Sequence, residues 1–178
     1  MVKLTSSDVR IERLTENHDV SSICSYEKDL IDFLTEDALS NQDKKISVTY
    51  LWFLKETDEL VGYISVLNDR INLEGDLKIH FKDKGIRYSS LPALKIGRLC
   101  VDDKFLRRGI GTLMMSFAVQ IANSIYEKHS GCRFIVLDAK RNNNPEKDSI
   151  HFYKPMGFKT LKERKKGTTP MYYDLLTN

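Results

Sequence analysis

The fold is decided by residues 96–113, which read IGRLCVDDKFLRRGIGTL. The segment starts as an apolar strand, passes through a polar turn and continues, from Gly109 onward, as a long amphipathic helix. Gly109 and Gly111 leave backbone N–H groups uncovered, while the helix dipole, Arg107 and Arg108 add positive charge. The segment therefore predicts a loop that grips a phosphate or a pyrophosphate. It lacks the GKS/T ending of a Walker A loop and the third glycine of a dinucleotide-binding fingerprint.

Periodic patterns extend from this segment in both directions along the chain. The expected elements are a strand at 9–14, one or two helices within 23–38, a hairpin of strands at 46–54 and 60–67, an irregular excursion at 69–91 with room for a short helix, a strand at 93–101, a helix at 109–128, a strand at 134–137, a short helix at 148–153 and closing strands at 159–165 and 171–176. This order predicts a mixed α/β or α+β sheet that contains an antiparallel hairpin. The strand–helix–strand unit at 93–137 predicts a right-handed parallel crossover.

The composition suits one compact domain over residues 1–178, because 41% of the residues are hydrophobic and prolines and glycines are few. We find neither an apolar run of membrane-spanning length nor a signal peptide, so we expect a cytoplasmic protein without a membrane partner. Cys24, Cys100 and Cys132 lack zinc-ligand spacing, so we expect no metal site and three small buried hydrophobes. A nucleophilic Cys100 is the alternative. The net charge of +3 says little about partners.

A second pattern lies at the end of the predicted helix at 148–153. Phe152 and Tyr153 end that helix, Gly157 turns the chain and Phe158 begins a strand. Taken alone, the pattern fits a hydrophobic helix terminus whose aromatic side chains pack in the core.

Together the two patterns resemble the GNAT superfamily of acetyl-CoA-dependent N-acetyltransferases. That family shows a Leu-x-Val strand end, a Gln/Arg-x-x-Gly-x-Gly/Ala loop, a long helix, a second buried strand and a Phe-Tyr-x-x-x-Gly-Phe element. The residues that match in order and spacing are Leu99, Cys100, Val101, Arg108, Gly109, Ile110, Gly111, Thr112, Phe152, Tyr153, Gly157 and Phe158. The resemblance implies an α/β (α+β) fold with a mixed, mostly antiparallel central sheet of about six to seven strands, a splayed parallel pair and flanking helices.

Two positions depart from the family pattern. The first position of the loop, Gln or Arg in the family, is Leu106 here. Since the family holds pyrophosphate mainly through backbone N–H groups, this change should weaken the grip without abolishing it. The Asn that often lies seven residues before the Tyr is Glu146, and Asn142, Asn143 or Asn144 could replace it.

The resemblance implies direct transfer of the acetyl group of acetyl-CoA to a primary amine. Pantetheine is expected to pair with backbone groups of Leu99 and Val101, where an N–H would polarise the acetyl carbonyl. Tyr153 is expected to act as general acid toward the leaving thiolate, because an ordinary tyrosine pKa of about 10 keeps its proton in place at neutral pH. The expected cofactor-binding residues are Leu99, Cys100, Val101, Arg107, Arg108, Gly109, Ile110, Gly111, Thr112 and Asn144.

The general base is not evident from the sequence. No histidine is clearly placed for this role, which leaves Glu12, Asp102 or a relayed water. An α-amine with a pKa near 7.8 is about 15% neutral at pH 7, whereas a lysine amine near 10.4 is only about 0.04% neutral. The lack of a clear base therefore favours an α-amine acceptor.

Segments 26–34 and 90–99 loosely resemble the GNAT toxins of toxin–antitoxin pairs, which acetylate the α-amino group of aminoacyl-tRNA. The acceptor is accordingly an aminoacyl-tRNA, a protein N-terminus or a small amine. The basic stretch at 159–166 fits either a contact with tRNA phosphates or a solvated hairpin. The resemblance also makes a homodimer an expected assembly. The competing functions are a catalytically silent module that binds acyl-CoA and a nucleotide-phosphate binder unrelated to acyl transfer.

Overall fold

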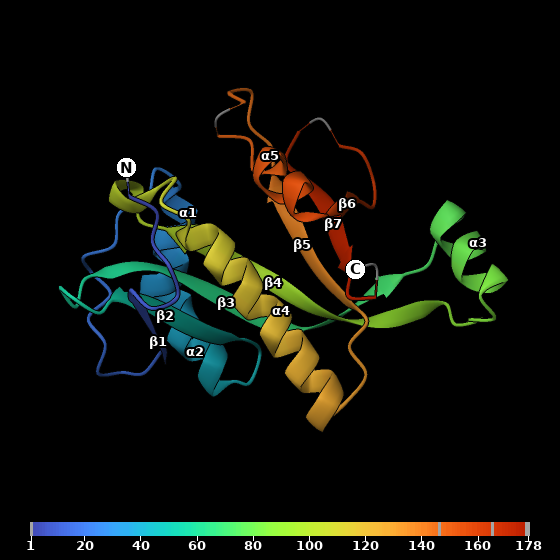
Figure 1. Cartoon of the computed structure of the whole chain (residues 1–178), viewed down its shortest axis with the longest axis horizontal. Helices are drawn as coiled ribbons and strands as arrows, with labels where there is room; N and C mark the ends of the chain where they lie inside the picture. Colours follow the sequence, from blue (N-terminus) through green and yellow to red (C-terminus); the bar gives the residue numbers. More distant parts are fainter. Residues whose placement is uncertain (1, 146, 165, 177–178) are drawn as a thin grey trace. The chain divides into compact units, whose positions relative to one another are not determined.

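The computed structural model describes residues 2–145, 147–164 and 166–176 (Figure 1). The strands are β1 (Val9–Arg13), β2 (Val48–Leu54), β3 (Leu60–Asn72), β4 (Ser90–Val101), β5 (Phe134–Lys140), β6 (Lys159–Thr160) and β7 (Thr168–Asp174). The helices are α1 (Lys28–Asp32), α2 (Ala38–Asp43), α3 (Gly75–Asp83), α4 (Ile110–Lys128) and α5 (Ile150–Tyr153), and a π-helical turn (Phe33–Asp37) joins α1 to α2. In the residues described, no helix combines the length and the apolar character needed to cross a membrane.

The strands form one mixed sheet in the order β1-β2-β3-β4-β5-β7-β6. The β1–β2, β2–β3, β5–β7 and β6–β7 pairs are antiparallel, whereas β4 and β5 form a parallel pair. A parallel pair needs a long crossover connection, which α4 provides. The predicted fold class, a mixed and mostly antiparallel sheet with a parallel pair and flanking helices, is confirmed.

Contacts divide the chain into two compact units. The first comprises the residues up to Leu67 together with Ile96–Ala118, and the second comprises Asn68–Lys95 together with the residues from Val119 onward. The expectation of a single domain over residues 1–178 stays a prediction.

The first unit has apolar packing on both faces of β2, because successive strand residues point to opposite faces. Leu51 joins Leu34 of the π-helical turn in a buried cluster. Its neighbour Tyr50 instead meets Phe117 of α4 edge-on, with ring centroids 5.0 Å apart. Helical segments therefore pack against β2 from both sides within this unit.

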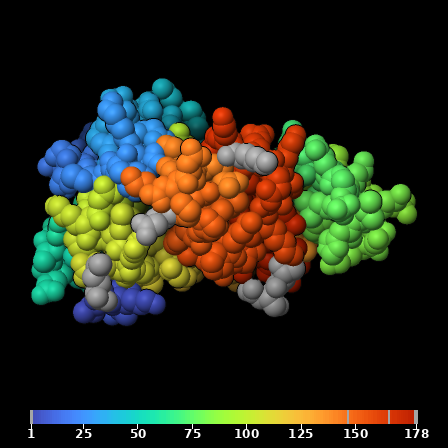
Figure 2. All heavy atoms as spheres, turned by 90° about the horizontal axis from the view of Figure 1, so that it is seen from above, coloured from blue at the N-terminus to red at the C-terminus, as the bar shows by residue number. Residues whose placement is uncertain are grey.

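The second unit buries an aromatic cluster around Phe134 of β5. Phe81 of α3 meets Phe134 edge-on at 5.7 Å between ring centroids, and Tyr172 of β7 packs against the same cluster. Figure 2 shows the atoms of α3 in green beside those of the C-terminal strand in red. The short helix allowed for in the excursion predicted at 69–91 is present as α3, but the irregular conformation predicted for its two ends is wrong, since β3 extends to Asn72 and β4 begins at Ser90. Phe81 is the single buried residue of α3, which explains the weak periodicity.

Two other elements end at residues that differ from the prediction. The helical stretch predicted at 23–38 ends with α2 at Asp43, because the Gln42 side chain donates to the Leu14 carbonyl at 2.8 Å and accepts from the Thr49 N–H at 3.2 Å. These bonds hold a polar last turn in place.

The strand predicted at 159–165 is only two residues long. Leu161 donates its N–H to the Pro170 carbonyl of β7 at 2.8 Å, but Pro170 has no N–H to return. The ladder therefore stops, and the rest of the predicted strand is a loop, with Lys165 outside the described residues.

Candidate functional site

The loop between β4 and α4, which the sequence predicts to bind a phosphate, contains two residues with positive φ. Within this phosphate loop (residues 106–112), Arg107 has a φ of 62° and Gly109 a φ of 92°. The first helical bond of α4 runs from the Leu113 N–H to the Gly109 carbonyl at 3.1 Å. The N–H groups at 110–112 therefore precede any acceptor within the helix and are available to a ligand. Thr112 is exposed and Gly111 half-buried, so this end of α4 is open to solvent.

Contacts on either side hold the phosphate loop. The Arg108 carbonyl accepts the Leu4 N–H at 2.8 Å, and the Arg108 guanidinium lies 5.2 Å from the centroid of the Phe105 ring. Phe105, which precedes the loop, and Ile110, which begins α4, are buried and anchor this part of the chain. A Cβ added at Gly109 would meet the Leu4 carbonyl oxygen at 3.4 Å. Leu106, which departs from the family pattern, is 39% exposed.

Asp102 stabilises the turn that leads into the loop. Its carboxylate is buried and accepts the Cys24 N–H at 2.7 Å and the Lys104 N–H at 2.9 Å. Asp103 donates its own N–H to the Cys24 carbonyl at 3.0 Å. From the sequence, Asp102 is only a candidate base, because a partner 78 residues away leaves no local signal.

The end of β4 carries the residues expected to meet pantetheine. Cys100 is buried, while Leu99 and Val101 are half-buried. Burial raises the pKa of the Cys100 thiol to about 12, so the thiol stays protonated at neutral pH and the alternative of a nucleophilic Cys100 loses its support. The expectation of three buried cysteines is wrong for the other two, since Cys24 is exposed and Cys132 half-buried. Both lie outside the strands, whereas Cys100 lies within β4.

Tyr153 ends α5 in the second unit and is 8% exposed. Its ring lies 5.0 Å from that of Phe152 and 5.7 Å from that of Phe158, measured between centroids. Gly157 has a φ of 92° and makes the turn that brings Phe158 back against Tyr153. Burial raises the pKa of Tyr153, which keeps the hydroxyl protonated at neutral pH.

The asparagines that could replace the family's Asn lie in the segment between β5 and α5. Asn144 is exposed, and its N–H donates to the Asn142 side-chain oxygen at 2.9 Å. Glu146 lies outside the described residues. Asn144 and Tyr153 belong to the second unit. The other predicted binding residues belong to the first unit.

The carboxylate of Glu12 is also engaged. It accepts from His18, with 2.9 Å between Oε2 and Nε2, and it pairs with Arg10. The hydrogen bonds from His18 and Arg10 lower the pKa of Glu12, which makes it a weaker base. Glu12 is thus a poor candidate for the general base, and the Asp102 carboxylate is occupied by two backbone N–H groups.

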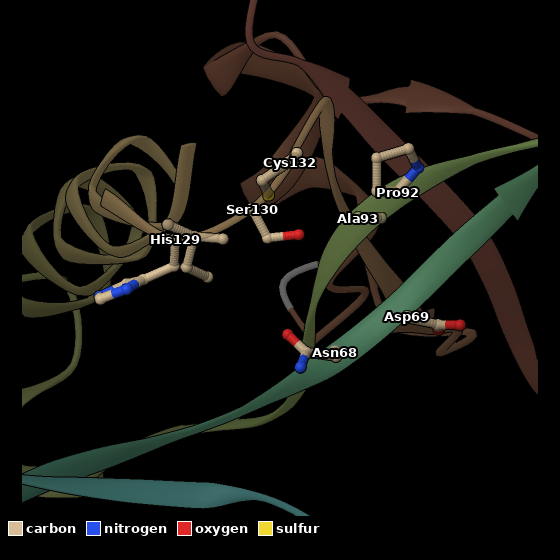
Figure 3. Close-up of a pocket in the computed structure, with 9 residues that line it drawn as sticks. Asn68, Asp69, Pro92, Ala93, His129, Ser130 and Cys132 are labelled. Atoms are coloured by element: carbon tan, nitrogen blue, oxygen red, sulfur yellow. The ribbon is translucent and has the colours of Figure 1, made fainter. Parts of the chain in front are cut away.

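A separate cavity of about 400 Å³ lies in the second unit. Its lining comes from β3, β4, the last turns of α4 and the segment after α4, and consists of Asn68, Asp69, Pro92, Ala93, Ile125, His129, Ser130, Gly131 and Cys132. Figure 3 shows the Ser130 hydroxyl turned toward the strand side and the His129 ring turned away from it. The lining contains none of the site residues that the sequence predicts.

Comparison with known proteins identifies the family. The model of the acetyltransferase (GNAT) family matches residues 14–158. This chain belongs to the GNAT acetyltransferase family. The GNAT chain is therefore an acetyl-CoA-dependent N-acetyltransferase.

Solved structures share the GNAT fold along almost the whole chain. A tyrosine-to-phenylalanine mutant of KacT matches with a TM-score of 0.77 and 20% identity, over 94% of this chain and 95% of that one. AtaT complexed with acetyl-methionyl-tRNAfMet matches with a TM-score of 0.72 and 22% identity, over 91% of this chain and 94% of that one. AtaTR bound with AcCoA matches with a TM-score of 0.73 and 21% identity, over 95% of each chain. At these identities the likeness shows the fold.

Proposed function

We propose that this GNAT chain transfers the acetyl group of acetyl-CoA to the α-amino group of an aminoacyl-tRNA, with Tyr153 as general acid. The observation that carries the proposal is the conformation of the phosphate loop at the start of α4. In this proposal residues 1–178 act as one GNAT domain, of which residues 14–158 match the family model. Acetyl-CoA supplies an activated thioester that an amine attacks directly.

The phosphate loop suits the diphosphate of acetyl-CoA. Three N–H groups at 110–112 project from the positive end of the α4 dipole, and Arg107 and Arg108 supply the charge. Because these donors are mostly backbone groups, the loss of a side-chain donor at Leu106 should weaken the grip on the diphosphate without abolishing it. Leu99, Cys100 and Val101 would then pair with pantetheine through their backbone.

Tyr153 has the protonation state that a general acid needs before the reaction. Its raised pKa keeps the phenolic proton in place until the sulfur leaves. The aromatic rings of Phe152 and Phe158 pack against its ring.

The choice of an α-amine acceptor rests on two supports. First, both candidate bases, Glu12 and Asp102, are held in hydrogen bonds, so an acceptor that is already partly neutral at pH 7 fits better than a lysine side chain. Second, the exposed residues Lys159, Lys162, Arg164 and Lys166 give the β6–β7 segment a positive surface suited to phosphates. AtaT, a structural neighbour, has been solved with acetyl-methionyl-tRNAfMet.

Tyr153→Phe tests the catalytic part of the proposal. We expect kcat to fall by about 10²- to 10⁴-fold, with the Kd for acetyl-CoA unchanged, because only proton donation is removed. Tyr126→Phe is the matched control, since Tyr126 lies on α4 and is 71% exposed. Equal turnover by the two variants would remove Tyr153 from the mechanism.

The acceptor is tested by offering labelled acetyl-CoA with charged tRNAs, peptides with free N-termini and small amines, followed by mass spectrometry. We expect acetylated aminoacyl-tRNA, at a rate that falls steeply as salt rises. Acetylation of peptides or small amines in preference to tRNA would replace the proposed acceptor. Binding of acetyl-CoA without transfer to any acceptor would identify a catalytically silent module instead.

A further inference from the structure

A partly buried ion pair lies at the start of α5, the helix that carries Tyr153. Arg141 follows β5 directly and donates through Nε to Asp148 Oδ2 at 3.0 Å. The other carboxylate oxygen of Asp148 accepts the Ile150 N–H, the first of α5, at 3.2 Å. The Asp148 side chain is only 5% exposed and that of Arg141 22% exposed. One carboxylate therefore joins the end of a sheet strand to the first turn of α5.

Arg141 also binds the segment that precedes β7. Its Nη1 donates to the Arg164 carbonyl at 2.6 Å, and its backbone N–H donates to the Gly167 carbonyl at 2.9 Å. The buried Thr169 hydroxyl donates to the same Arg164 carbonyl at 3.1 Å. The guanidinium thus spans two loops, and a lysine amine at this position would reach Asp148 or Arg164 but not both with the same geometry.

α5 needs such an anchor because it is only four residues long. A single turn has no stability of its own, so its position depends on tertiary contacts. Ile150 is buried and supplies apolar contact, but apolar contact alone does not set the rotation of a helical turn as a directed hydrogen bond does. Asp148 supplies that direction five residues before Tyr153.

We propose that Asp148 and Arg141 are positioning residues for Tyr153, a role that rests on the proposed function of Tyr153 as general acid. The pair fixes the start of α5, and α5 places the phenolic hydroxyl. Loss of the carboxylate charge leaves Arg141 without its buried partner and frees the first turn of α5 to rotate. A displacement of this kind lowers the rate of proton donation while the phosphate loop, in the other compact unit, keeps its structure.

The same unit offers a matched control pair. Arg133 binds Asp174 through Nε at 2.7 Å and Nη2 at 2.9 Å, with side chains 20% and 8% exposed. This pair flanks the opposite end of the β5–β7 ladder, where Phe134 pairs with Asp174. It therefore matches the first pair in chemistry and burial, but its ion pair lies where β5 begins, whereas Arg141 and α5 follow the end of β5.

The experiment compares Asp148→Asn with Asp174→Asn, each in the wild-type and the Tyr153→Phe background. We expect Asp148→Asn to lower kcat by about 10- to 100-fold in the wild-type background, as for a misplaced catalytic group, with the Kd for acetyl-CoA unchanged. In the Tyr153→Phe background it should have no further effect on kcat, because the group that it positions is already absent. Asp174→Asn should lower Tm and leave kcat unchanged in both backgrounds.

Three outcomes would overturn the proposal. The first is wild-type kcat in Asp148→Asn, and the second is an equal loss in both backgrounds, which would show an effect that bypasses Tyr153. The third is wild-type kcat in Tyr153→Phe alone, which would refute the proposed general acid and the positioning role with it. If Asp148→Asn fails to fold by circular dichroism, Arg141→Lys replaces it under the same criteria, because it retains the charge and changes only the geometry.

Discussion

Replacing Gly62 by alanine tests how closely β3 approaches the end of β4. A Cβ added at Gly62 would lie 2.4 Å from the Cys100 carbonyl oxygen, 2.7 Å from the Met114 Cε atom and 3.2 Å from the Val101 Cα atom. Two of these atoms belong to the backbone, which cannot rotate aside as the end of a side chain can. The Cys100 carbonyl would have to retreat by about 0.6 Å to reach a separation of 3.0 Å.

The size of the effect follows from this displacement. Forcing an extra carbon into a packed interior costs about 1–3 kcal/mol, and a backbone clash belongs in the upper part of that range. We therefore expect Gly62→Ala to lower the free energy of unfolding by about 2–3 kcal/mol. For a chain of this size that corresponds to a fall in Tm of roughly 4–12 °C.

The same displacement should weaken cofactor binding. Cys100 and Val101 lie on the strand end expected to pair with pantetheine, and a hydrogen bond there contributes about 1 kcal/mol. Its loss would raise the Kd for acetyl-CoA about fivefold.

Urea unfolding and calorimetric titration with acetyl-CoA measure the two effects. Gly97→Ala is the matched control, because its Cβ would meet only the Leu67 Cδ2 atom at 3.0 Å and the Ser65 carbonyl oxygen at 3.7 Å. The Leu67 methyl can move, so this control should change the free energy of unfolding by no more than about 0.5 kcal/mol. If Gly62→Ala proves as stable as Gly97→Ala, the close approach of β3 to the end of β4 is refuted.

Two further predictions concern titratable groups. Cys24 should be alkylated rapidly by iodoacetamide and Cys100 should resist, because Cys24 is exposed, while a pKa of about 12 leaves Cys100 with about one thiolate in ten thousand at pH 8. Acid should destabilise the second unit through Asp174: burial opposes its ionisation, but the hydrogen bonds from Arg133 and a backbone N–H outweigh burial and lower its pKa. A carboxyl group whose pKa is lower in the folded protein than in the unfolded protein stabilises the fold above about pH 4. This contribution disappears as the pH falls through the pKa that the group has in the folded protein.

Each of these predictions has an internal control. Alkylation in urea should modify Cys24 and Cys100 alike, and equal labelling rates in the native protein would contradict the burial of Cys100. The free energy of unfolding of Asp174→Asn should depend less on acidic pH than that of the wild type. Parallel pH profiles for the two proteins would show that Asp174 has no lowered pKa.

Local patterns were sufficient for the part of the site around α4. Glycine tolerates positive φ without help from distant residues, and Gly109, which the sequence places in the loop, has a positive φ. The helix itself follows from apolar spacing, so the predicted start at 109 and end at 128 differ from α4 by one residue at most. The aromatic turn at Gly157 follows for the same reason.

Patterns failed where one distant contact decides the structure. Phe81 anchors α3 against Phe134, more than fifty residues away, so the segment at 69–91 appeared irregular. Pro170 ends the β6–β7 ladder from the partner strand, so the extent of β6 was not visible in its own residues.

The chain's local chemistry thus specified the order of elements, the family pattern and the loop at the start of α4, because backbone conformation and amphipathic spacing act within a few residues. Tertiary contacts alone assigned Asp102 to the Cys24 backbone, Asp148 to Arg141 and Gly62 to the end of β4. A buried carboxylate takes whichever donors the fold brings to it. Its role therefore emerges only when segments distant in the chain pack together.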